Sequence, residues 1–213
     1  MRSFAYLVAL LGALSACAAK TGPAPIATVS LEPPPPSAVW RETANAADAA
    51  LLDTMPQLWA SALAGAQPAR TAIAGEGVLL NPSAALDHPA LPPGSYNCRV
   101  VRIEGRRLRS FPAQFCFVGG ETDGRLSFNK QTGSDLPNGW LYPDEHNRYI
   151  FLGAQRRAPD DNALAYGSER ARDLAGVVER VGPFRWRLVM PRRGPDALWI
   201  YELTPVPTER QPG

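Results

Sequence analysis

The spacing of apolar residues changes partway along the chain. Over residues 40–67, alanine, leucine and methionine recur three or four positions apart, which predicts an amphipathic helix. Asn45 is a suitable N-cap, and Pro56 predicts a kink or a restart because proline has no amide hydrogen to donate. A weaker helical pattern covers about residues 69–80. We therefore expect region 38–82 to be helical.

From Tyr96 onward, apolar and polar residues alternate instead. The clearest case is 184–190, where Phe, Trp, Leu and Met alternate with two arginines and a valine. Turn signals such as Asp123-Gly124 separate about eight such stretches within region 95–206, which predicts an antiparallel meander, either a barrel or a sandwich. The expected fold class is α+β, with a helical segment packed on a mainly antiparallel β domain.

These elements make up a single expected domain over residues 38–206, followed by a flexible tail over 207–213. A proline-rich, extended connection is expected over about 83–94, between the helical and the β region. About 120 residues of β structure are enough for a small barrel with a core of its own.

The N-terminus has the pattern of an export signal. Residues 1–16 begin with a short positive segment and continue with an apolar run that is too short for a membrane anchor. The run ends in Leu-Ser-Ala-Cys, which resembles the bacterial lipobox. The resemblance implies that Cys17 carries the lipid, with palmitate among its acyl chains. An ordinary secretory signal with an incidental cysteine is the alternative.

The residue after the modified cysteine indicates where such a protein would go. Ala18, rather than aspartate, implies sorting to the periplasmic face of the outer membrane. The rest of 17–37 is rich in proline and is expected to form an extended, semi-rigid tether. The membrane, reached through the lipid anchor, is therefore an expected partner.

Composition excludes several classes of function. The chain has 213 residues with 22 Lys and Arg, 20 Asp and Glu, and a net charge of +2, which lacks the electrostatic footprint of a nucleic-acid-binding protein. A hydrophobic content of 45% excludes a wholly disordered chain. With only two histidines, the usual zinc sites are not expected, and no cofactor is predicted.

Two cysteines remain once Cys17 is assigned to the lipid. Cys98 and Cys116 lie in the first two predicted strands, where a structural disulfide would suit an oxidising periplasm. In the loop-entropy model such a bridge contributes ~3 kcal/mol. A redox-active pair is the alternative, although no Cys-x-x-Cys spacing is present to lower a thiol pKa.

Residues that could carry chemistry are few. Asp144, His146 and Ser134 are the residue types of a nucleophilic triad, but the first two share one turn and no nucleophile elbow precedes the serine. A polar turn explains them better. No catalytic residue is predicted.

One polar set is a more promising candidate for ligand binding. By alternation, Lys130 and Glu179 both point inward, where opposite charges could form a buried pair. The pair would either fix strand register or form the polar floor of a barrel mouth that binds a small anionic or polar ligand. The candidate ligand-binding residues are Lys130, Thr132, Ser134, Glu179, Arg180 and Arg185.

A local arginine cluster is a second polar feature. Its members are Arg99, Arg102, Arg106, Arg107 and Arg109. In a lipoprotein, such a cluster could contact phosphate head groups or anionic wall polymers. A charged edge hairpin that resists aggregation is the other interpretation.

Several short motifs occur together in a characteristic order. They are LPPGSYNCR at 91–99, TGS at 132–134, GWLYPD at 139–144 and GVVERVGP at 176–183, preceded by WRET at 40–43. In that order they resemble domain-of-unknown-function family 4893, a group of exported bacterial proteins, over about residues 38–206. Pro56 and residues 106–110 depart from the family pattern. The resemblance supports the fold and implies no established activity.

Two functional hypotheses follow. The first is an uncharacterised cell-envelope lipoprotein whose periplasmic domain is a non-catalytic module that binds a small ligand or an envelope protein. The second is a periplasmic hydrolase that acts on envelope material through carboxylates such as Asp144 and Glu179, which would need to share one cleft.

Overall fold

The computed structural model describes residues 36–144, 147–161, 165–194 and 196–207. These residues belong to one of the two units into which the chain divides, Pro34–Gly213. The predicted signal peptide, the lipid-bearing Cys17 and nearly all of the tether lie outside the described residues.

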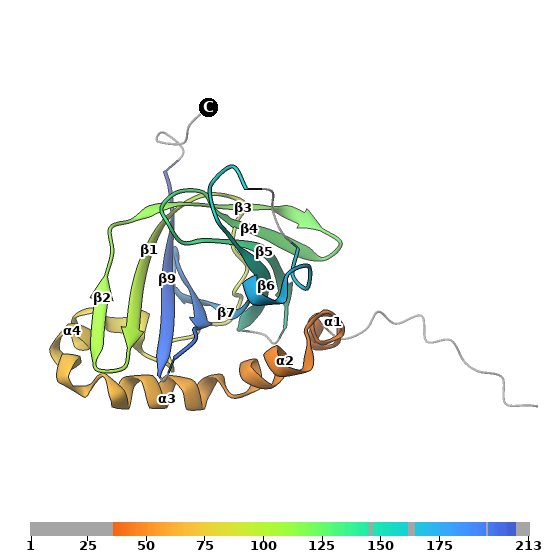
Figure 1. The fold of residues 1–213 in the computed structure, drawn as a ribbon. Coiled ribbons are helices and arrows are strands. Elements are labelled where there is room, and N and C mark those ends of the chain that lie inside the picture. Colours follow the sequence, from red (N-terminus) through yellow and green to blue (C-terminus); the bar gives the residue numbers. More distant parts are fainter. Residues whose placement is uncertain (1–35, 145–146, 162–164, 195, 208–213) are drawn as a thin grey trace, which may run out of the picture. The chain divides into compact units, whose positions relative to one another are not determined.

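Nine strands form one antiparallel sheet in the described part of the chain. They are β1 (Gly94–Glu104), β2 (Arg107–Ser110), β3 (Gln114–Thr122), β4 (Arg125–Lys130), β5 (Leu136–Pro143), β6 (Arg148–Arg156), β7 (Asp173–Gly182), β8 (Arg185–Pro191) and β9 (Ala197–Pro205). Their order is β2-β1-β3-β4-β5-β6-β7-β8-β9, and β1 also pairs with β9. Eight strands therefore close into a barrel, with β2 as an extra strand, which confirms the α+β prediction and decides for a barrel (Figure 1).

Strand β1 is long enough to serve two neighbours. Its first half, Gly94–Cys98, pairs with β3, and its second half, Val101–Glu104, pairs with β2. Arg107 and Arg109 are exposed on β2, so this part of the arginine cluster lies on a charged edge hairpin.

Helices lie along one side of the barrel, as Figure 1 shows. They are α1 (Pro36–Thr43), α2 (Ala46–Asp53), α3 (Met55–Gly65) and α4 (Arg70–Gly75), with a 3₁₀ turn at Gly77–Leu80. The Asn45 side chain accepts a hydrogen bond from the Asp48 amide at 2.9 Å, as expected of an N-cap. Pro56 stands in the first turn of α3, where its missing N–H costs no hydrogen bond, so the helix restarts there.

The sheet buries side chains on both of its faces. The interior of the barrel is filled by an apolar cluster that includes Tyr96, Phe128, Phe151 and Trp186. A second cluster lies between the helices and the outside of the barrel. Its members include Trp40, Leu52, Trp59, Val101, Ile150, Val177 and Ile200.

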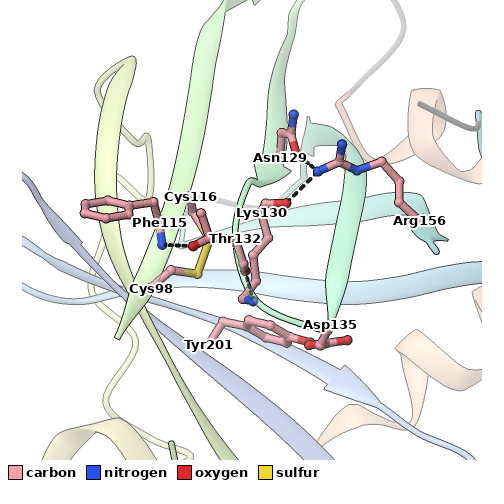
Figure 2. The surroundings of a disulfide bond; sticks show 9 residues. All are labelled: Cys98, Phe115, Cys116, Asn129, Lys130, Thr132, Asp135, Arg156 and Tyr201. Atoms are coloured by element: carbon pink, nitrogen blue, oxygen red, sulfur yellow. Dashed lines mark hydrogen bonds between the residues drawn. A yellow bond between two sulfur atoms is a disulfide. The ribbon is translucent and has the colours of Figure 1, made fainter. Parts of the chain in front are cut away.

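The predicted disulfide is confirmed. Cys98 and Cys116 are bonded, with their Cα atoms 5.6 Å apart, and both side chains are fully buried inside the barrel (Figure 2). The bond joins β1 to β3 where their ladder ends, because Cys98 is the last residue of β1 to pair with β3.

The extended connection between the helices and β1 covers one end of the barrel. Leu91 joins the interior cluster, and the Trp186 indole donates to the Pro89 carbonyl at 3.0 Å. The Tyr96 hydroxyl donates to the carbonyl of Pro92. This end is therefore covered by the chain itself. The opposite end, where β4 ends and β5 begins, is called the barrel mouth below.

Candidate functional site

Lys130 lies at the barrel mouth, at the end of β4. It is 2% exposed, and its Nζ donates to the Thr132 carbonyl at 2.6 Å (Figure 2). The following loop wraps tightly around the ammonium group. Gly133 has φ +89°, which favours glycine, and a Cβ there would lie 2.9 Å from Nζ, so a larger residue would also displace the ammonium group. The predicted inward orientation of Lys130 is confirmed.

Asp135 is the carboxylate that both hollows of the mouth share. Its Oδ2 accepts a hydrogen bond from the Tyr201 hydroxyl, and its Oδ1 accepts one from Arg192 at 2.9 Å. Burial, followed by the charge of Asp135, raises the pKa of Tyr201 well above its ordinary value. Tyr201 therefore stays a donor and holds the carboxylate in place.

Burial of the Lys130 ammonium group makes its protonated form less favourable. Desolvation is the main cause that lowers the pKa of Lys130, and the Arg102 charge adds to it, whereas Asp135 acts in the opposite direction. A nearby anion would favour the charged form.

Arg102 has no partner for its charge in the described part of the chain. Its guanidinium lies 4.5 Å from the ring centre of Phe111 and 3.5 Å from that of Trp199. Arg192 contacts the same indole at 4.0 Å. The Nε atom of Arg102 is buried and makes no hydrogen bond. The aromatic rings hold the cation in position without neutralising it.

Two adjoining hollows open at the mouth. A cleft of about 810 Å³ is lined by residues from several strand ends, among them Gln155, Arg172 and Trp199. A smaller pocket of about 130 Å³ is lined by Val100, Phe111, Gln114, Lys130 and Gly133, among others. Both hollows share Arg102, Ser134 and Asp135.

Positive charge dominates the larger cleft. It is lined by six arginines and two aspartates: Arg102, Arg156, Arg157, Arg172, Arg192, Arg193, Asp135 and Asp173. Arg157 and Arg172 form ion pairs with Glu169 and Asp161. Arg156 donates to the carbonyls of Lys130 and Pro159.

The structure divides the predicted ligand-binding set between the two ends of the barrel. Lys130, Thr132 and Ser134 come together at the mouth, where the Thr132 hydroxyl accepts the amide of Phe115 at 2.9 Å. Glu179, Arg180 and Arg185 lie toward the closed end, since β7 places Asp173 at the mouth and Gly182 at the far end.

Lys130 and Glu179 do not form the expected pair. Glu179 lies on the outer face of β7 under the helical layer, with its carboxylate 2.7 Å from the fully buried Arg187. Arg187 also donates to the carbonyls of Leu79 and Asn81. The prediction that Glu179 points into the barrel was wrong because the outer face of β7 is apolar too, being covered by helices.

The other two predicted residues serve the closed end. Arg180 donates to the carbonyl of Asp87 in the covering connection, at 2.6 Å. Arg185 pairs with Glu202 at 2.5 Å, and Arg99 pairs with the same carboxylate at 2.6 Å. These contacts hold neighbouring strands and the connection together, and none of the cavities described above includes Arg180 or Arg185.

The carboxylates of the hydrolase hypothesis are engaged in structural contacts. Asp144 accepts the Trp40 indole N–H at 2.8 Å and pairs with Arg148 at 2.7 Å, which ties α1 to the barrel. Ser134 lies at the mouth, and His146 lies outside the described residues. No group of three or more His, Cys, Asp or Glu among the described residues is arranged to hold a metal ion.

Sequence reasoning missed several members of the mouth, among them Asp135, Arg192, Trp199 and Tyr201. The alternation itself could have found two of them. Arg192 continues the inward positions of β8 beyond Met190, and Trp199 precedes the inward Tyr201 by two residues. Asp135 lies in a loop, where alternation gives no orientation.

No helix among the described residues is both long and apolar enough to cross a membrane. Comparison with curated proteins finds no match. The family model described as "Domain of unknown function (DUF4893)" matches residues 40–203, which include the helical layer and almost the whole barrel. This match confirms the resemblance noted in the sequence, and the chain therefore belongs to the DUF4893 family.

Proposed function

We propose that this protein is a non-catalytic binding module that takes a small polar ligand at the barrel mouth. The observation that carries the proposal is the cleft of about 810 Å³ that the described residues form at the barrel mouth. Concave sites with a few convergent polar groups are the usual form of small-ligand sites.

The contents of the barrel support a site at the mouth rather than deeper inside. Aromatic and aliphatic side chains, including Phe128, Phe151 and Met190, fill the interior behind Lys130. The polar groups at the mouth are already oriented, since Asp135 is held by both Tyr201 and Arg192. Preorganised groups bind more tightly because little ordering remains to be done on binding.

The cellular setting is part of the same proposal. The signal-like residues 1–16 and the lipobox-like sequence ending at Cys17 favour a lipoprotein on the periplasmic face of the outer membrane. The Cys98–Cys116 disulfide suits an oxidising compartment. The partners would then be the membrane, through the lipid, and a small ligand or an envelope protein.

Hydrolysis of envelope material has less support. Acid–base catalysis by two carboxylates needs both in one cleft with different pKa values. Asp144 and Glu179 are instead each paired with an arginine on the outer face of the barrel, under the helices.

Native mass spectrometry of the full-length protein, purified gently from its natural envelope, tests the proposal. A retained small molecule that is lost on denaturation, and whose rebinding shifts the amide signals of Gly133 and Ser134, is the expected result. A bare protein whose mouth signals respond to no compound in a broad library of polar metabolites would overturn it.

A further inference from the structure

We propose that the ligand of the barrel mouth carries a phosphate monoester group, which sits in the smaller pocket against Arg102 and Lys130. The inference rests on the proposed function and adds the chemical class of the ligand. Three features support it: a charge on Arg102 that no described residue pairs with, the lining of the smaller pocket, and the sum of the charges around it.

Arg102 is built to receive an oxyanion. Phe111 and Trp199 fix the plane of its guanidinium, and its buried Nε makes no hydrogen bond. Asp135, the carboxylate that lines the same pocket, is already engaged by Arg192 and Tyr201. A guanidinium binds phosphate through two parallel N–H donors, so a fixed plane with free donors suits that group.

The smaller pocket supplies a second cation and further donors. The Lys130 ammonium has three donors and gives one to the Thr132 carbonyl. Ser134 adds a hydroxyl to the wall, while Val100, Phe111 and Pro112 make the rest of it apolar. Charge-assisted hydrogen bonds are strong in such surroundings because little water competes for them.

The charges around the pocket match a dianion. Arg102 and Lys130 line the pocket as cations, Asp135 is the one carboxylate among its described lining residues, and Arg192 pairs with Asp135 from the adjoining cleft, so three positive charges less one negative leave +2. A phosphate monoester carries about −1.5 to −2 at pH 7. A carboxylate would neutralise only half of the excess.

The larger cleft accommodates the rest of the ligand. It shares Arg102, Ser134 and Asp135 with the smaller pocket, so a phosphate held there projects its ester group directly into a volume of about 810 Å³. A soluble phosphorylated metabolite and the head group of a phosphomonoester lipid have this same chemistry.

The test is titration of the full-length protein with glycerol 3-phosphate and, in parallel, with glycerol and acetate. Binding is measured by calorimetry and by the amide signals of Gly133 and Ser134. Arg102→Met keeps the aliphatic stem between the rings and removes the charge. Arg157→Met is the matched control, because it removes the same charge from the wall of the same cleft, where Arg157 is exposed and paired with Glu169.

We expect glycerol 3-phosphate to bind more tightly than acetate, and Arg102→Met to weaken its binding by about tenfold or more. Arg157→Met should weaken it by less than about threefold, since an exposed charge acts through solvent. Equal losses of affinity in the two variants would overturn the inference, because they would indicate a general electrostatic attraction of the phosphate to the cleft rather than a specific site at Arg102.

Other outcomes separate the inference from the proposed function. If glycerol or acetate binds at the mouth as tightly as the phosphate, the phosphate class is wrong and the binding module stands. If no polar compound shifts the mouth signals, both fail.

Should Arg102→Met fail to fold, Lys130→Met serves instead, with the same expected tenfold loss. Binding to vesicles that contain phosphatidic acid, displaced by glycerol 3-phosphate, would identify a lipid source, and its absence a soluble one.

Discussion

Lys130 combines complete burial with a positive charge, which makes it the most informative single residue at the mouth. Its ammonium is held by one backbone carbonyl, and its pKa is lowered chiefly by desolvation. A buried charge in this position lowers the free energy of unfolding, and such a loss of stability is common at binding sites.

We predict that Lys130→Met raises the free energy of unfolding near neutral pH, on the order of 1 kcal/mol, because an apolar side chain of similar length replaces a buried charge. The lowered pKa sets the sign of the pH dependence. As pH rises toward the ordinary value of 10.5, folded Lys130 releases its proton before the unfolded chain does, so the wild type gains stability. The advantage of the variant should therefore shrink between neutral pH and pH 10.5. Urea unfolding of both proteins at several pH values measures this, and a difference independent of pH would contradict it.

Arg187 is the counterpart of Lys130 on the outer face of the barrel. It is fully buried, pairs with Glu179 and donates to several carbonyls of the Gly77–Leu80 turn and the residues that follow. Its guanidinium also lies 5.1 Å from the Trp59 ring centre. One side chain thus connects β8 with the helical layer.

We expect Arg187→Met to lower the free energy of unfolding by about 3–5 kcal/mol, because Glu179 and the carbonyls lose their donor while buried. Arg185→Met is the control on the same strand. It breaks a more exposed pair with Glu202 and should cost about 1 kcal/mol or less. Chemical denaturation of the two variants gives the comparison, and similar losses would show that Arg187 contributes no more than a surface ion pair.

At the scale of elements, the disulfide compensates for a weak point in the barrel. β1 leaves β3 at Cys98 and continues with β2 as its neighbour on that side, so the β1–β3 ladder is short. The Cys98–Cys116 bond spans 18 positions in the sequence and joins the two strands where this ladder ends. It links the two strands where their backbone pairing stops.

Replacing both cysteines by serine should therefore cost ~3 kcal/mol by the loop-entropy model. Amide hydrogen exchange should increase first in β3, and least in the β7–β8–β9 ladders, which the bond does not touch. Thermal unfolding measures the loss of stability, and hydrogen-exchange mass spectrometry measures the exchange of each strand. Exchange that rises uniformly over all strands would argue against a local role.

At the scale of the whole molecule, the mouth and the helical layer are independent regions of one sheet. Glu179 is six residues from Asp173 along β7, which corresponds to about 20 Å. Glu179 supports the helices, whereas Asp173 lines the mouth cleft. A change at one should not reach the other.

We predict that Glu179→Gln lowers stability but leaves the amide signals of Gly133 and Ser134 unchanged, whereas Lys130→Met shifts them. Heteronuclear correlation spectra of the two variants make the comparison. Shifted mouth signals in Glu179→Gln would mean that the two faces of the sheet are coupled. The sequence-based prediction that Lys130 and Glu179 belong to one ligand-binding set would then have a functional basis.

Local sequence determined the parts of this protein that depend on local physics. Period-two alternation predicted the strands, Asn45 the helix start and Pro56 the restart, because each depends on neighbouring residues alone. The disulfide was predicted from the expectation of an oxidising compartment and from the position of the two cysteines other than Cys17, and the bond between them is confirmed.

Only the tertiary structure decided which face of β7 lies inside. Both faces of β7 and β8 are apolar, since the barrel fills one and the helices cover the other, so alternation placed Glu179 on the wrong side. Closure through β1 and β9, the covered end and the uncovered mouth likewise depend on residues about a hundred positions apart. The surroundings of Arg102 were decided in the same way: whether a charge has a partner depends on what the folded chain places beside it, and among the described residues those are two aromatic rings and no carboxylate within ion-pair distance.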